Sequence, residues 1–204
     1  MPFGVALLEI ARAMALSTGK PVVLQTERFE LRSMRPIDAS DRWVGWARDP
    51  EVMGPLNSPV VQMSRDDLSK FLATSDNVNR YIIGIFDKVS RIQVGFFMVD
   101  IDNGHHLATF NVVIGEKEWW GKGVINEARA ALLDHFFEQV GVEKACGQPL
   151  ARNFPAVLNY KAQGWRHEGT QRAQRRSVSG GGRLDQYQFG LLRDEWREAR
   201  RKAT

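Results

Sequence analysis

The stretch from Val112 to Gln139, VVIGEKEWWGKGVINEARAALLDHFFEQ, constrains the fold of this chain more than any other. It opens with β-branched residues that favour a strand and continues through glycines into a helix-forming segment. Beyond Gly123, apolar residues recur at helical spacing. They are Val124, Ala128, Leu132 and Phe136, with Ala131 and His135 on the same stripe. The stretch therefore predicts a strand, a tight turn and an amphipathic helix in direct succession.

The turn Trp120-Gly121-Lys122-Gly123 falls where that helix begins. The first amides of a helix have no partner within the helix and lie at the positive end of its dipole, so a helix start attracts an anion. Glycine lets those amides approach a phosphate without a Cβ in the way, and Lys122 adds a positive charge. We interpret this turn as a phosphate cradle, although a GxG before a helix is more often only a turn and a cap.

Two common phosphate-binding patterns do not fit the spacing of these glycines. A dinucleotide-binding fingerprint needs a third glycine where Asn126 stands. A Walker A loop needs four residues between its glycines, followed by Lys and then Ser or Thr.

The stretch instead resembles the acetyl-CoA-binding motif of the GNAT superfamily of N-acetyltransferases, Gln/Arg-x-x-Gly-x-Gly/Ala at a strand-to-helix turn. It is most similar to the branch of the ribosomal-protein (Rim-type) acetyltransferases, in which an aromatic-Trp-Gly-Lys-Gly run precedes Glu-Ala. Here the run is Trp119 to Gly123, followed by Glu127-Ala128. Trp120 takes the Gln/Arg position, and Ile125 replaces the usual Gly or Ala.

Two separated stretches carry the same resemblance. Thr26 to Arg32, TERFELR, is similar to the opening of the Rim-type branch, and Leu191 to Trp196, LLRDEW, is similar to its ending. The resemblance implies an acetyl-CoA site at the strand end, the turn and the starts of two helices. The implied cofactor-binding residues are Val112, Val113, Ile114, Trp120, Gly121, Lys122, Gly123, Val124, Ile125, Asn126, Asn153 and Ala156.

A second motif lies at Asn153 to Trp165, NFPAVLNYKAQGW. Its residues alone predict a helix with Asn153 as N-cap, a proline in the first turn and a glycine stop. The segment is similar to the family's Asn-x-x-Ser/Ala…Tyr-x-x-x-Gly-Phe motif, with Ala156 in place of the frequent serine. Tyr160 stands where many members carry the tyrosine that protonates the departing thiolate, so it is the implied catalytic residue. The alternative is a core tyrosine whose hydroxyl bonds to the backbone.

The general base is missing where members often carry a carboxylate, on the strand before the motif. Glu116, Glu118 and Asp100 are near only in sequence, and we interpret them as surface charges. Without a base, an α-amine of pKa about 8 is ~10–20% neutral near pH 7, whereas a lysine amine of pKa about 10.4 is below ~0.1% neutral. A peptide N-terminus is therefore the favoured acceptor, with a small-molecule amine as the alternative. A non-catalytic CoA-binding sensor or assembly module is the runner-up.

Composition narrows the other function classes. The chain has 204 residues and a formal charge of +4, without a nucleic-acid motif, so we expect one domain and no nucleic-acid partner. A single cysteine, Cys146, forms no internal disulfide and suits a cytoplasmic location. The adjacent His105-His106 lacks further ligands, so no metal is expected.

The first 20 residues form an expected extension to a GNAT-like domain at residues 21–204. Met1 to Ser17 is apolar at helical spacing, but Glu9 and Arg12 interrupt it, so it is not a membrane span. We expect an amphipathic helix that packs on the domain or on a second copy in a homodimer.

The rest of the chain predicts a mixed α/β fold. Expected strands are Val22–Arg32 with a turn near Thr26, Tyr81–Phe86, Gln93–Ile101, Leu107–Ile114, Lys144–Leu150, Trp165–Arg175 and Leu184–Leu192. Helices are expected from Pro36 to about Asp49, from Ser64 to about Ala73, after Gly123 and after Asn153. Pro55–Pro59 is an expected loop, and the choice of acceptor is expected to depend on loops such as Met53–Pro59. We interpret Ser177–Gly182 as a mobile hairpin tip, with closure over the acceptor as the alternative. The resemblance adds a mostly antiparallel central sheet, helices on both faces and strands splayed around acetyl-CoA.

Overall fold

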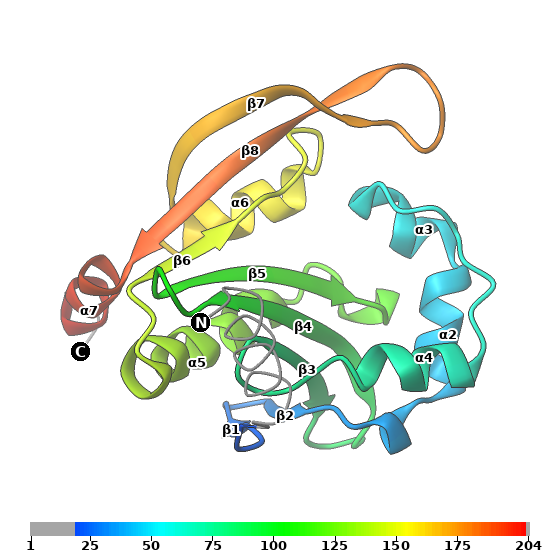
Figure 1. Ribbon diagram of the computed structural model, residues 1–204, viewed down its shortest axis with the longest axis horizontal. Helices are drawn as coiled ribbons and strands as arrows, with labels where there is room; N and C mark the ends of the chain where they lie inside the picture. Colours follow the sequence, from blue (N-terminus) through cyan, green and yellow to red (C-terminus); the bar gives the residue numbers. More distant parts are fainter. Residues whose placement is uncertain (1–18, 203–204) are drawn as a thin grey trace, which may run out of the picture.

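One sheet of eight strands forms the centre of the computed structural model, which describes residues 19–202 (Figure 1). The strand order is β1-β2-β3-β4-β5-β6-β8-β7, and β5 and β6 are the parallel pair among antiparallel neighbours. The strands are β1 (Val23–Gln25), β2 (Phe29–Ser33), β3 (Arg80–Asp87), β4 (Gln93–Asp102), β5 (Leu107–Ile114), β6 (Lys144–Gly147), β7 (Arg166–Arg176) and β8 (Arg183–Leu192). The predicted mixed, mostly antiparallel sheet is confirmed.

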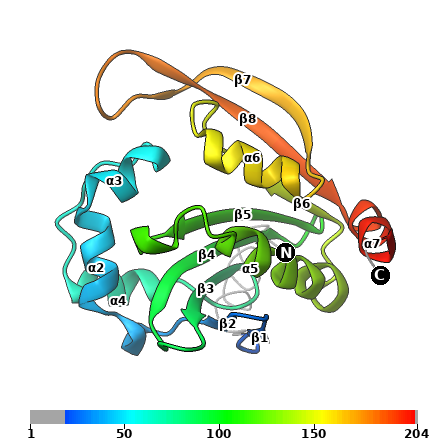
Figure 2. The ribbon, with the colours of Figure 1, turned by 180° about the vertical axis from the view of Figure 1, so that it is seen from behind.

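Helices cover both faces of this sheet (Figures 1 and 2). They are α2 (Asp41–Arg48), α3 (Pro50–Met53), α4 (Arg65–Leu72), α5 (Val124–His135), α6 (Phe154–Ala162) and α7 (Arg193–Lys202). Short 3₁₀ segments lie at Pro36–Asp38, Gly54–Leu56 and Lys117–Trp119.

The two-sided cover follows from strands that are apolar at successive positions. Alternate residues of a strand point to opposite faces. On β3, Ile83 and Ile85 belong to the core that contains α5 and α6, whereas Ile82 belongs to the core that contains α2 and α4. On β4, Phe97 belongs to the core that contains α5 and α6, whereas Phe96 packs against the core that contains α2 and α4. Continuous apolar strands therefore require a helical layer on each side.

The parallel pair, β5 and β6, is hydrogen-bonded over only a short stretch, which leaves the rest of β5 unpaired on that side. β5 pairs with β6 only from Leu107↔Lys144 to Thr109↔Cys146. Beyond Thr109, β5 continues to Ile114 beside β4, while β6 ends at Gly147 beside β8. The two strands move apart from this point (Figures 1 and 2). The splayed strands expected from the family resemblance are present.

Several predicted boundaries are wrong. The single helix expected from Pro36 is a 3₁₀ turn followed by α2, because the Ser40 side chain accepts the Trp43 amide and starts a new helix. The strand expected to reach Leu150 ends at Gly147, and Leu150 makes only an isolated bridge to Gln186.

Two other segments differ in kind. The helix expected after Gly123 is α-helical only to His135 and continues as a π-helical turn, Phe136–Val140. The loop expected at Pro55 is partly a 3₁₀ turn that follows α3.

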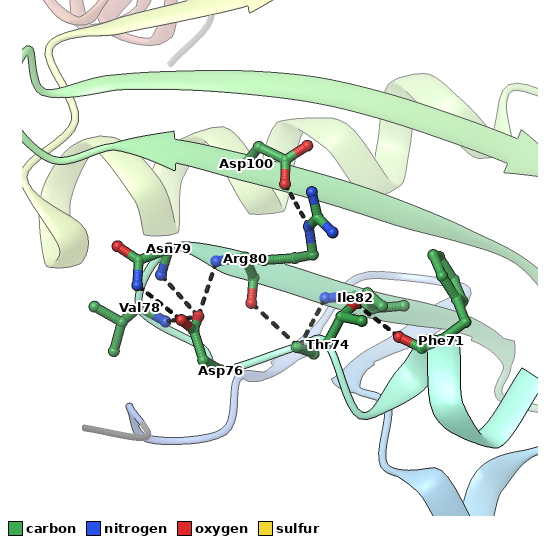
Figure 3. Close-up of polar contacts among 9 residues, drawn as sticks. Phe71, Thr74, Asp76, Val78, Asn79, Arg80, Ile82 and Asp100 are labelled. Carbon is green, nitrogen blue, oxygen red and sulfur yellow. Dashed lines mark hydrogen bonds and ion pairs between the residues drawn. The ribbon is translucent and has the colours of Figure 1, made fainter. Parts of the chain in front are cut away.

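The entry to β3 shows how a side chain fixes a connection (Figure 3). The Asp76 carboxylate accepts the backbone amides of Val78, Asn79 and Arg80 at 2.8–2.9 Å. The Arg80 side chain then pairs with Asp100 on β4 at 2.6 Å. Asp100, one of the sequence-proposed base candidates, is therefore engaged in a cross-strand ion pair.

The predicted helix at Met1–Ser17 lies outside the described residues, so the 1–20 and 21–204 division stays a prediction. Within residues 19–202, every helix is too short or too polar to cross a bilayer.

Candidate active site

A cavity of about 500 Å³ opens where β5 and β6 move apart. Its walls come from both faces of the sheet. One side is formed by α5 and α6, and the other by α4, β4 and the Pro55–Ser58 segment. The lining includes Pro55, Leu56, Asn57, Ser58, Phe71, Phe96, Met98, Phe110, Asn111, Val112, Val113, Ile125, Arg129, Gln148, Pro149, Leu150, Asn153, Ala156, Asn159, Tyr160, Arg175 and Gln186. The opening thus connects the helix-start side of the sheet to the side that carries α4.

The turn before α5 has the backbone geometry that a phosphate cradle requires. Gly121 and Gly123 have φ values of +73° and +72°, a region that side chains with a Cβ rarely adopt. The first amide bonded within the helix is that of Glu127, which donates to the Gly123 carbonyl at 3.1 Å. The amides of Val124, Ile125 and Asn126 come before it, so they have no partner within the helix.

This turn is held by residues from the other end of the chain. The Glu127 carboxylate accepts the Thr26 hydroxyl at 2.6 Å, the Arg28 amide at 2.8 Å and Arg28 Nε at 2.6 Å. Arg28 also donates to the Lys122 carbonyl at 3.0 Å. The β1–β2 turn therefore fixes both the loop and the first turns of α5.

Trp119 and Trp120 also hold the glycine turn in position. Trp120 Nε1 donates to the Ile114 carbonyl at 2.8 Å, while the residue as a whole is 42% exposed. Trp119 packs edge-on against Phe29, and its ring lies 5.5 Å from Lys122 Nζ. The end of β5 and the glycine turn are thereby tied to each other and to β2.

Tyr160 lies on α6 with its side chain in the cavity wall and is 5% exposed. Its ring stacks on Phe189 at 5.1 Å, and its hydroxyl donates to the Phe110 carbonyl over 3.4 Å. A Cβ on Gly147 would come within 2.3 Å of that hydroxyl, so only glycine fits there. Burial raises the pKa of Tyr160, so the phenol keeps its proton at neutral pH.

A domain model described as an acetyltransferase (GNAT) domain matches residues 28–165 of the chain. The chain belongs to the GNAT acetyltransferase family. It is 30% identical over 179 residues to the uncharacterized N-acetyltransferase p20 of Bacillus licheniformis, covering 85% of this chain and 97% of that relative. The chain is accordingly an acyltransferase, and enzymes of this family use acetyl-CoA.

Solved structures share the fold of this GNAT enzyme. The ribosomal-protein-S5-alanine acetyltransferase of Vibrio fischeri is similar with a TM-score of 0.74 and 16% identity, over 86% of this chain and 98% of that one. The spermidine N-acetyltransferase of Vibrio cholerae, in complex with CoA and spermine, is similar with a TM-score of 0.73 and 19% identity, over 83% and 98%. At these identities the likeness concerns the fold.

The residues proposed from sequence for acetyl-CoA divide into two neighbouring groups. Val112, Val113, Ile125, Asn153 and Ala156 line the cavity. Ile114, Trp120, Gly121, Lys122, Gly123, Val124 and Asn126 lie at or beside the turn, outside the lining.

Several of these residues have side chains engaged by the protein itself. Val124 is buried in the core, so it offers only its amide. Ile125 lines the cavity and also packs against the core of the GNAT enzyme. Asn153 is the predicted N-cap, because its Oδ1 accepts the Ala156 amide at 3.3 Å. Its Nδ2 donates to the Pro55 carbonyl at 3.2 Å.

The described lining of the cavity contains no Asp, Glu or His, and its ionisable side chains are Arg129, Tyr160 and Arg175. Glu116 instead accepts Trp46 Nε1 at 3.0 Å and pairs with Arg42 at 2.8 Å. Glu118 is exposed. No sequence-proposed carboxylate therefore faces the cavity of the GNAT enzyme.

The outer rim of the cavity is closed by Asn57, which sequence reasoning passed over. Asn57 Nδ2 donates to the Arg176 carbonyl at 2.7 Å, and its Oδ1 accepts the Val178 amide at 3.0 Å. Its own φ is +54°, a left-handed value that asparagine tolerates. The Pro55–Ser58 segment is thus joined to the tip of the β7–β8 hairpin. Asn-Ser after Pro-Leu was the available sequence signal, but it indicates only a turn.

Within residues 19–202, no group of three or more His, Cys, Asp and Glu side chains is placed to hold a metal ion. The Cys146 thiol is half-buried in β6, and burial raises its pKa.

Proposed function

We propose that this GNAT enzyme moves the acetyl group of acetyl-CoA to a weakly basic primary amine, with a peptide N-terminus as the favoured acceptor. The observation that carries the proposal is the cavity at the β5–β6 opening, which has no acidic side chain in its described lining and carries two arginines. This chemistry accords with the Rim-like branch suggested by the sequence motifs. A cytoplasmic location and a homodimer remain proposals.

The residues present fit the diphosphate and the pantetheine arm of acetyl-CoA. The glycines at positive φ and the free amides at the start of α5 suit the diphosphate. Beyond Thr109, the edge of β5 facing β6 has no strand partner, so its backbone groups can bond the amides of the pantetheine arm. Val112, Val113 and Ala156 give that arm a mainly apolar wall.

Acyl transfer then needs few protein groups. The neutral amine nitrogen attacks the thioester carbonyl carbon, and a β5 amide donates to the carbonyl oxygen, which gains negative charge. The carbon–sulfur bond breaks, and Tyr160 supplies its phenolic proton to the sulfur. The proton lost from the amine nitrogen passes to solvent and restores the phenol.

The lack of an acidic wall argues against a polyamine acceptor. A polyamine carries several positive charges at neutral pH. Each charge that leaves water loses hydration free energy, which a nearby negative charge must compensate. Here the described ionisable side chains of the wall are Arg129, Arg175 and the protonated Tyr160. An α-amine of pKa about 8 is ~10–20% neutral at pH 7, so it can react without a carboxylate base.

A thiol-release assay with acetyl-CoA tests this assignment. The acceptors are a peptide with a free N-terminus and an internal lysine, the same peptide with its N-terminus acetylated, spermidine and an aminoglycoside. We expect turnover with the free peptide and a loss of most turnover when the N-terminus is blocked. Preferred turnover of spermidine would contradict the acceptor class. Tight acetyl-CoA binding without turnover on any acceptor would favour the sensor alternative.

A further inference from the structure

Arg129 is a buried cation in the wall of the cavity. It lies in the second turn of α5, is 1% exposed and lines the cavity beside Tyr160. Within residues 19–202, no carboxylate forms an ion pair with it. A buried charge without a counter-charge is costly, because the group loses its hydration shell. An apolar residue could pack between α5 and α6 without this loss of hydration free energy. We therefore looked for a function that needs the charge.

The contacts of Arg129 are all to neutral groups. One Nη donates to the Asn159 carbonyl at 2.8 Å, and Nε donates to Gln163 Oε1. Gln163 Nε2 in turn donates to the Asn126 carbonyl at 2.7 Å, in the first turn of α5. Burial lowers the pKa of Arg129 to about 10, so the guanidinium remains charged at neutral pH. The side chain is therefore fixed in position and keeps its charge.

The guanidinium faces the proposed acid directly. Its central carbon lies 4.4 Å from the centre of the Tyr160 ring and 5.3 Å from that of Trp165. A cation over an aromatic face holds the ring in one orientation. It also stabilises negative charge that forms on the phenol oxygen, and this effect is large where water is excluded.

We propose that Arg129 is a positioning residue for acyl transfer, which orients Tyr160 and compensates the charge on its oxygen when the proton leaves. This inference rests on the proposed role of Tyr160. As the carbon–sulfur bond breaks, the sulfur takes the Tyr160 proton and the phenol becomes phenolate beside the guanidinium. The phenolate then regains a proton from solvent, which has received the one released by the amine nitrogen.

The remaining groups around Tyr160 do not supply this compensation. Phe189 on β8, Phe110 on β5 and Trp165 are uncharged. Cys146 on β6 is the other titratable group that acts on Tyr160, and its negative form would raise the pKa of the phenol. Burial also raises that pKa, and Arg129 opposes both effects. Within residues 19–202, Arg129 is therefore the group that lowers the pKa of Tyr160 and so favours the phenolate.

The test uses the full chain and four variants: Arg129→Gln, Arg129→Lys, Tyr160→Phe and the Arg129→Gln/Tyr160→Phe double variant. Glutamine is neutral but can still donate to the Asn159 carbonyl, and lysine restores the charge. We expect Arg129→Gln to lower kcat by ~10-fold or more, because phenolate formation loses its counter-charge. Acetyl-CoA affinity should change by less than ~3-fold, and Arg129→Lys should recover part of the lost rate.

Two readouts separate this role from a purely structural one. In the Tyr160→Phe background, the Arg129→Gln change should alter kcat by less than ~2-fold, because residues that act as a unit are not additive. The alkaline limb of the kcat–pH profile, where Tyr160 loses its proton, should move to higher pH in Arg129→Gln. Equal effects of Arg129→Gln with and without Tyr160, or an unmoved limb, would overturn the proposal. Arg129→Met serves as the neutral variant if Arg129→Gln does not fold.

The same variants distinguish failure of this inference from failure of the proposed function. If Tyr160→Phe turns over at the wild-type rate, the acid role fails, and the Arg129 proposal fails with it. If wild-type protein binds acetyl-CoA but acetylates none of the acceptors, the acceptor assignment is wrong. Loss of rate in Tyr160→Phe together with an additive Arg129 effect overturns only the inference about Arg129.

Discussion

Glu127 and Arg28 are 99 residues apart in the chain, yet Arg28 donates to the Glu127 carboxylate both from its backbone amide, at 2.8 Å, and from Nε, at 2.6 Å. The same carboxylate accepts the Thr26 hydroxyl. Charge-assisted bonds of this kind are stronger than neutral ones and fix geometry. The position of the glycine turn, and with it the proposed diphosphate site, therefore depends on a pair of residues from two distant segments.

We predict that Glu127→Gln lowers the free energy of unfolding by about 2–3 kcal/mol at pH 7, because an amide NH₂ replaces one acceptor opposite Arg28. The affinity for acetyl-CoA should fall as well, since the Lys122 carbonyl and the turn lose their anchor. Denaturant unfolding and acetyl-CoA titration measure the two effects. Glu138→Gln, on the π-helical turn, is the matched control because it breaks an exposed ion pair with Arg197 far from the turn.

The stability from Glu127 should depend on pH in a definite direction. Its hydrogen bonds to Thr26 and Arg28 outweigh burial and lower the pKa of the carboxyl below its ordinary 4.5. A lowered pKa stabilises the fold above the ordinary value, and this contribution is lost as the pH falls through the lowered pKa. The difference in unfolding free energy between wild type and Glu127→Gln should therefore shrink below about pH 4. A constant difference down to pH 2 would contradict the assignment.

Gly123→Ala should weaken acetyl-CoA binding by ~10-fold or more and cost about 1–2 kcal/mol of stability. The φ of Gly123 is +72°, so a Cβ strains the backbone and intrudes where the amides would meet the diphosphate. Gly180→Ala is the control, because Gly180 has φ +83° in open space at the hairpin tip. A similar loss of acetyl-CoA affinity in both variants would show that strain alone, not the cradle, is responsible.

The cradle illustrates what could be predicted from sequence. Gly121 and Gly123 before an apolar stripe indicated a turn at a helix start, and the structure has both glycines at positive φ. Apolar alternation likewise placed most strands, and the family resemblance gave the splayed pair. These features depend on local chemistry, because glycine and β-branched residues restrict the backbone where they stand.

Tyr160→Phe should lower kcat by ~10²-fold or more, because it removes the proton donor for the leaving sulfur. Acetyl-CoA affinity should change by less than ~3-fold, since the ring stacking on Phe189 is retained. Tyr81→Phe is the matched control: Tyr81 is also a buried tyrosine, but it lies outside the cavity lining. A wild-type rate for Tyr160→Phe would remove its acid role.

Asn57→Gly should raise the KM for the acceptor several-fold while leaving acetyl-CoA affinity unchanged. Glycine keeps the left-handed backbone but loses the bonds to the Arg176 carbonyl and the Val178 amide. The rim between the Pro55–Ser58 segment and the hairpin would then open. Asn77→Gly is the control, because Asn77 also has φ +54° but lies in the loop before β3. An unchanged KM would show that the rim does not contact the acceptor.

The contacts of Asn57 at the cavity rim and the burial of Arg129 could not be predicted from the sequence. Asn57 meets residues near position 177 only after the whole sheet has formed, and no local pattern encodes that contact. Arg129 stands on the helix as a cation beside an apolar stripe, which alone predicts solvent exposure. Its burial follows from the aromatic rings of Tyr160 and Trp165, supplied by a different segment. Such long-range contacts depend on tertiary packing.

We expect acetyl-CoA to bind with its diphosphate at the start of α5 and its pantetheine arm between β5 and β6. A crystal structure of the chain with CoA tests this most directly. We expect diphosphate oxygens within about 3 Å of the amides of Gly121 and of Gly123 to Asn126, with the sulfur beside the Tyr160 hydroxyl. CoA bound elsewhere, with these amides facing solvent, would exclude the turn before α5 as the diphosphate site.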